Sequence, residues 1–129
     1  MSACEERYIG LMSGTSCDSI DAALVSFDEG RPTSLHTHNH PLPAALKQKI
    51  LDISKPGDNE IDRMGALDRE LGIVFAEAAL SLIDSSGLSR NLITAIGSHG
   101  QTIRHRPPAS TTPHPFTLQI ADPNQIAQL

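Results

Sequence analysis

Two short apolar runs near the start of the chain flank a turn that is rich in polar residues. The runs extend from Tyr8 to Met12 and from Ile20 to Phe27, and each has the length of a strand. The stretch GLMSGTSCDSID joins them, so we predict a β-hairpin with a wide loop. Because the second run is apolar at successive positions after Asp21, it is typical of a strand covered on both faces.

The segment after this hairpin predicts a third strand. Asp28 to Pro32 reads as a turn, and the alternation from Ser34 to His40 indicates a strand that prolines end. His36, His38 and His40 would then lie on one face. A zinc site is conceivable there, but a solvent-facing edge strand is the favoured interpretation.

The middle of the chain predicts two helices. The first covers Ala44 to Ser54, and the second begins at Asp58 or Asn59 and ends near Ser85, with Gly87 as a left-handed cap. The apolar residues of the second helix recur at helical spacing and form a core-facing stripe: Ile61, Met64, Leu67, Leu71, Val74, Phe75, Ala78 and Leu82.

The last third of the chain returns to strand patterns. Leu92 to His105 begins as a buried strand and turns polar, and a proline-rich loop follows. Phe116 to Asp122 alternates as a strand, and Pro123 can open a helix. The predicted order of elements is three strands, two helices, two strands and the start of a helix. This order predicts an α/β domain in which helices pack on a mixed sheet.

Composition narrows the range of functions. The chain has 129 residues, which suits one domain, and only 3% are aromatic, so the core must be aliphatic. Scarce aromatics and a formal charge of −5 argue against nucleic acid as a partner, although backbone N–H groups can still bind a small phosphate. We expect no signal peptide and no membrane span, and reduced Cys4 and Cys17 in a cytoplasmic protein.

The polar turn is a candidate phosphate-binding loop. Successive backbone N–H groups in a tight turn form a concave anion site, and Gly14 lets the chain approach an oxygen closely. Thr15 and Ser16 can add hydroxyl donors, and the carboxylates of Asp18 and Asp21 could hold a hydrated Mg²⁺.

Other chemistries remain open for the same turn. The standard P-loop pattern is absent, and GTSCD resembles the serine-nucleophile motif G-x-S-x-G only in part. A cysteine nucleophile would need Cys17 and His99 to meet. A plain hairpin whose side chains cap its backbone is the simplest structural interpretation.

Two further segments are candidates for ligand recognition. Gly97 to Thr102 is rich in glycine and hydrogen-bonding side chains, which suits a sugar or polyol, although a β-bulge would explain the glycines. In the stretch IADPNQ, Asp122 could cap a helix.

Together these segments resemble one family. YIGLMSGTSCDSIDAALVSFD, AIGSHGQTIRHRP and FTLQIADPNQIAQ occur in the order and spacing of the bacterial anhydro-N-acetylmuramic acid kinases. The resemblance covers Tyr8 to Leu129. It implies an RNase H-like (actin-like ATPase) domain with ATP, Mg²⁺ and sugar bound in a cleft between two such domains. Family members open the 1,6-anhydro ring and phosphorylate O6, giving N-acetylmuramic acid 6-phosphate in cell-wall recycling, and a homodimer is expected for the full-length family.

The resemblance also implies roles for individual residues. The nucleotide segment carries over onto Gly14, Thr15, Ser16, Cys17, Asp18, Ser19, Ile20 and Asp21. The sugar side of the cleft carries over onto His99, Gln101, Thr102 and Asn124. Family members usually have glycine where this chain has Ser19, which predicts backbone strain if the position needs a positive φ.

Family members are much longer than this chain. Their catalytic Asp would lie beyond Leu129, and so would the second domain. Residues 1–129 are therefore expected to form an N-terminal domain that is incomplete at its C-terminal end and inactive alone. The alternatives are a non-catalytic remnant that binds sugar or a protein partner, and a Cys17/His99 hydrolase.

Overall fold

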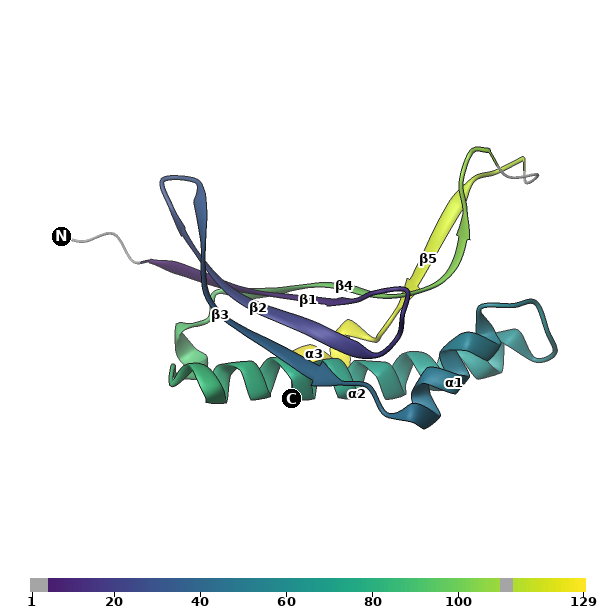
Figure 1. The fold of residues 1–129 in the computed structure, drawn as a ribbon, viewed down its shortest axis with the longest axis horizontal. Helices are drawn as coiled ribbons and strands as arrows, with labels where there is room; N and C mark the ends of the chain where they lie inside the picture. Colours follow the sequence, from purple (N-terminus) through teal and green to yellow (C-terminus); the bar gives the residue numbers. More distant parts are fainter. Residues whose placement is uncertain (1–4, 110–112) are drawn as a thin grey trace.

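The computed structural model describes residues 5–109 and 113–129 as one sheet with helices (Figure 1). Cys4 and part of the proline-rich loop lie outside these residues. The strands are β1 Glu6–Ser13, β2 Ser19–Asp28, β3 Arg31–Pro41, β4 Ala95–Arg106 and β5 Phe116–Ile120. The helices are α1 Ala44–Ile53, α2 Glu60–Ser86, the single 3-10 turn η1 Arg90–Leu92, and α3 Pro123–Gln128.

The sheet is mixed, with the strand order β3-β2-β1-β4-β5. β1 and β2 form the predicted antiparallel hairpin, β3 pairs antiparallel with β2, and β4 runs parallel to β1. β5 folds back antiparallel on the second half of β4. The α/β class and the third strand as an edge strand are therefore confirmed. Since β1 and β4 are parallel, the residues that end β1 lie beside the middle of β4.

The helices α1, α2 and α3 lie on one face of the sheet (Figure 1). α2 ends at the expected left-handed Gly87, with φ 76°, and its apolar stripe is buried from Leu67 onward, whereas Ile61 is 80% exposed. Their shared core is aliphatic apart from Phe75 and Cys17, and its most buried sheet residues are Ile9, Leu11, Ile20 and Leu24. Among the described residues, no helix is long and apolar enough to cross a membrane.

The opposite face of the sheet is only partly covered. Ala23 and Val25 of β2 are half-buried and Phe27 is 41% exposed, so the expectation of a strand covered on both faces is wrong for the described residues. The expected burial at the start of β4 is also wrong, since Ile96 is 37% exposed. β5 pairs only with Gln101–Arg106, and the first half of β4 is therefore an edge.

The three histidines of β3 point toward α2 rather than toward solvent. They pair with Leu24, Ala22 and Ile20, which face the core, so they share the helix-covered face. His36 contacts the Ser85 hydroxyl at 2.9 Å, and His40 lies 3.8 Å from the carboxylate of Glu77. Within the described residues, no three His, Cys, Asp or Glu side chains are arranged to hold a metal ion. The zinc interpretation therefore has no support.

Candidate functional site

The loop between β1 and β2 is a tight turn anchored by one buried side chain. The Cys17 N–H donates to the Gly14 carbonyl at 3.2 Å, and Cys17 adopts a left-handed conformation with φ 55°. The Cys17 side chain is 3% exposed and belongs to the core. Thr15 and Ser16 are exposed, and neither backbone N–H donates to a backbone carbonyl of the described residues. The turn thus presents free donors to solvent.

Ser19 stands where family members usually have glycine, but its backbone shows no strain from a positive φ angle. Among the described non-glycine residues, the positive φ angles belong to Cys17, Glu29, Asn59 and Ala121. Ser19 is instead the first residue of β2, and its backbone is extended with the strand. The residue of this loop that adopts a positive φ angle is Cys17, two positions earlier.

Asp18 is held at the end of the loop by a lysine from α1. Its carboxylate accepts a hydrogen bond from Lys47 Nζ at 2.5 Å, and its backbone carbonyl accepts one from the Leu42 N–H at 3.1 Å. The hydrogen bond and charge of Lys47 lower the pKa of Asp18, and a hydrogen bond with Ser16 adds to the effect. Asp18 therefore stays ionised although both side chains of the ion pair remain partly exposed.

Asp21 has a different partner on β3. Asn39 Nδ2 donates to the Asp21 carboxylate at 2.6 Å and to the Ser19 hydroxyl at 2.9 Å. Asp21 and Asn39 border a hollow of about 550 Å³ on the uncovered face of the sheet, which Met12 and His99 also line. The Ile20 side chain between them is fully buried, so its part in the loop is to anchor β2.

A buried hydrogen bond joins the loop to the second candidate segment. Ser13 ends β1 and lies opposite Gln101 of β4 in the parallel register. The Ser13 hydroxyl donates to Gln101 Oε1 at 2.5 Å, and Gln101 Nε2 donates to the Thr102 carbonyl at 3.0 Å. Ser13 is 3% exposed and Gln101 is 1% exposed. The Gln101 side chain is thus committed within the protein.

The glycine-rich part of β4 is a β-bulge. The register with β1 shifts between Leu11 and Met12, which leaves His99 without an opposite residue. Gly100 has φ 76°, and a Cβ there would lie 2.6 Å from the Ile120 carbonyl oxygen. His99 is exposed on the uncovered face, and Thr102 is half-buried with its hydroxyl accepting from Gln119 Nε2 at 3.0 Å. The segment from Gly97 to Thr102 therefore contains the β-bulge that would explain its glycines, and it also presents polar side chains.

The third segment begins α3 and is fixed by α2. The Asp122 carboxylate accepts from the Asn124 N–H at 2.9 Å, so the predicted helix cap is confirmed. Asp68 of α2 accepts from the Ala121 N–H with its carboxylate and from the Asp122 N–H with its backbone carbonyl. Asn124 is exposed just beyond Ile120, which pairs with Gln101.

The geometry disfavours a cysteine nucleophile. Burial raises the pKa of the Cys17 thiol, and its hydrogen bond runs to the Thr15 carbonyl at 3.6 Å. His99 instead contacts the carbonyl of Gly100 from the exposed face of the sheet. A buried neutral thiol is a poor nucleophile, since the thiolate is the reactive form.

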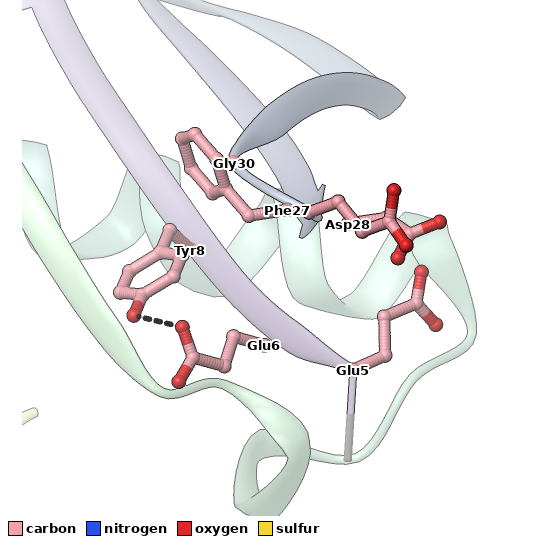
Figure 2. A pocket seen from close by; sticks show the side chains of 7 residues that line it. Glu5, Glu6, Tyr8, Phe27, Asp28 and Gly30 are labelled. Carbon is pink, nitrogen blue, oxygen red and sulfur yellow. Dashed lines mark hydrogen bonds between the residues drawn. The ribbon is translucent and has the colours of Figure 1, made fainter. Parts of the chain in front are cut away.

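A larger hollow lies at the other end of the β1–β2 hairpin (Figure 2). It measures about 880 Å³ and is lined by the carboxylates of Glu5, Glu6, Asp28 and Glu29. Tyr8 donates to Glu6 at 2.8 Å there, as the dashed line in Figure 2 shows. Four carboxylates repel phosphate, so this hollow is unsuited to an anionic ligand.

Two residues beside the candidate loop have no signal in the local sequence. Asn39 contacts Asp21 from β3, and Lys47 contacts Asp18 from α1, so only the fold brings them to the loop. The side-chain amide of Asn39 pairs with Asp21 because of the register of β3 with β2. The ammonium of Lys47 pairs with Asp18 because of where α1 begins.

Comparison with known proteins gives a consistent match. The family model described as anhydro-N-acetylmuramic acid kinase matches residues 6–129. Proteins named anhydro-N-acetylmuramic acid kinase are 49% identical over 120 residues in Shewanella halifaxensis, 51% over 125 in Coxiella burnetii strain Dugway and 51% over 122 in Shewanella loihica. These alignments cover 93%, 97% and 95% of this chain but 32% of each relative. The chain thus spans about a third of their length.

Proposed function

This chain belongs to the anhydro-N-acetylmuramic acid kinase family, and we propose that it forms the phosphate-binding part of an ATP-dependent kinase. The proposed reaction opens the 1,6-anhydro ring of anhydro-N-acetylmuramic acid and gives the 6-phosphate of N-acetylmuramic acid. The observation that carries the proposal is the placement of the Gly14–Asp18 loop beside the Gln101–Thr102 segment, at the edge where β1 ends.

The loop suits the phosphates of a nucleotide. Thr15 and Ser16 are exposed residues whose backbone N–H groups donate to no backbone carbonyl of the described residues, and a Cβ at Gly14 would meet no atom within 4 Å. An oxyanion can therefore approach the backbone closely from solvent. Lys47 adds a positive charge beside the loop, and it is partly exposed. Phosphoryl transfer depends mainly on positioning and on charge-stabilising donors of this kind.

The two aspartates fit a role as outer ligands of Mg²⁺. Both offer carboxylate oxygens, which Mg²⁺ prefers, and the pKa of Asp18 is lowered by Lys47 so that it is charged. Since no ready-made group of three ligands exists within the described residues, water and phosphate would complete the coordination. When bound, Mg²⁺ would neutralise charge on the phosphates.

The sugar would lie on the β4 side of the loop. His99 and Asn124 are exposed and Thr102 is half-buried, so these side chains can offer hydrogen bonds to hydroxyl groups. We place the base that activates water in the part of the relatives' length that this chain does not span. We also propose an RNase H-like domain, which the order and directions of β3, β2, β1 and β4 support.

A chimera tests this proposal. Residues 6–129 of this chain would replace the matching segment of the Coxiella burnetii relative, to which the chain is 51% identical. The chimera and the parent are incubated with Mg-ATP and anhydro-N-acetylmuramic acid, and mass spectrometry measures the phosphorylated sugar. We expect product from both and none from the 129-residue chain alone. A folded chimera that binds neither substrate, beside an active parent, would refute the proposal.

A further inference from the structure

We infer that the Ser13–Gln101 hydrogen bond positions the loop against β4, and that Gln101 is a positioning residue rather than a sugar contact. This inference rests on the proposed function, because it assigns a task to a residue of the proposed site. It departs from the expectation that the resemblance gives for Gln101.

The first argument is that Gln101 is buried and that both ends of its side-chain amide already have a partner within the protein. Its oxygen accepts from the Ser13 hydroxyl at 2.5 Å, and its nitrogen donates to the Thr102 carbonyl at 3.0 Å. The residue is 1% exposed. A sugar hydroxyl could reach this amide only if the residues that cover it moved apart, because almost none of Gln101 is accessible from solvent.

The second argument is that the bond spans the two halves of the site. Ser13 immediately precedes the loop, and Gln101 lies between the bulge at His99 and Thr102. The sequence separation is 88 residues, so the bond closes a long-range contact rather than a local turn. This single hydrogen bond therefore fixes the position of the loop backbone relative to the side chains of β4 that we propose face the sugar.

The third argument is that the bulge selects this pairing. Gly100 adopts φ 76° and packs against the carbonyl of Ile120, which holds β4 in the shifted register. Without that shift Gln101 would not lie opposite Ser13, because a slip of one residue turns every side chain to the other face. The bulge thus places Gln101 beneath the loop and leaves His99 on the exposed face.

Hydrogen exchange of the loop amides tests the inference on the complete 129-residue chain. Ser13→Ala removes the donor, and Gln101→Met keeps the side-chain length without the amide. Both should speed exchange of the Cys17 amide, whose N–H donates to the Gly14 carbonyl across the loop, by about tenfold, because a buried partner is left unpaired and the turn loosens. The double variant should exchange no faster than either single variant. Ser26→Ala is the matched control, since Ser26 is also 3% exposed but lies at the other end of β2.

A binding measurement distinguishes a positioning role for Gln101 from direct contact with the sugar. Titration with Mg-ATP and with anhydro-N-acetylmuramic acid should show weakened nucleotide binding in both variants, with sugar binding retained. Unchanged loop exchange in folded variants, or a loss of sugar binding alone in Gln101→Met, would overturn the inference. If Mg-ATP does not change the exchange rates of the loop amides in the unmodified chain, the proposed function fails. The exchange rates measured without nucleotide still decide whether the Ser13–Gln101 bond positions the loop.

Discussion

Gly100→Ala is expected to destabilise the protein more than any other glycine substitution in β4. Alanine at φ 76° costs about 1 to 2 kcal/mol in the left-handed region. Its Cβ would lie 2.6 Å from the Ile120 carbonyl oxygen, a backbone atom that cannot rotate away. Overpacking of this kind adds about 1 to 3 kcal/mol, for a total loss of about 2 to 5 kcal/mol.

Gly97→Ala provides the control within the same strand. Its Cβ would meet no atom within 4 Å and its φ is not positive, so the variant should be more stable than wild type by about 0.5 to 1 kcal/mol. Urea unfolding followed by circular dichroism gives both free energies of unfolding. Equal stabilities for the two variants would show that the bulge at Gly100 does not have the geometry described here.

The loop offers three more tests. Gly14→Ala should leave the melting temperature unchanged because its Cβ meets no neighbour, yet weaken Mg-ATP binding by about tenfold, and unchanged affinity would argue against close phosphate contact. Cys17 should react slowly with iodoacetamide in peptide-resolved mass spectrometry, since burial raises the pKa of its thiol, and rapid native labelling would contradict this. Because Lys47 lowers the pKa of folded Asp18 below its ordinary 3.8, the stability it contributes is present above that value and lost as pH falls through the folded pKa. Asp18→Asn should therefore be slightly less stable in urea at about pH 7 and low salt, the difference should shrink as the pH falls below 3.8, and a pH-independent difference would refute this account.

Much of the secondary structure could be predicted because local patterns determine it. The β1–β2 hairpin, the first helix and the cap at Gly87 follow from alternation, helical spacing and glycine. Burial was harder to predict, since it depends on which face of a strand the helices cover. Ile96 is apolar yet partly exposed, because β5 does not reach its part of β4.

The site could be predicted only as separate segments. The loop and the Gln101 segment each show a local excess of small and polar residues, but their contact depends on the parallel register of β1 and β4. The partners of the aspartates, Lys47 and Asn39, come from elements that a local motif does not include. The left-handed residue also lies at Cys17 and not at Ser19, because loop closure onto Gly14 sets that angle.

The most direct test of the central claim is an amide chemical-shift titration of the chain with Mg-ATP and, separately, with tripolyphosphate. Such a titration detects weak binding by an isolated phosphate site. We expect saturable shifts at Gly14, Thr15 and Ser16 with both ligands, and none at Gly30 beside the carboxylate-lined hollow. Absence of shifts in the loop, or equal shifts at both ends of the hairpin, would contradict the assignment of this loop as a phosphate site.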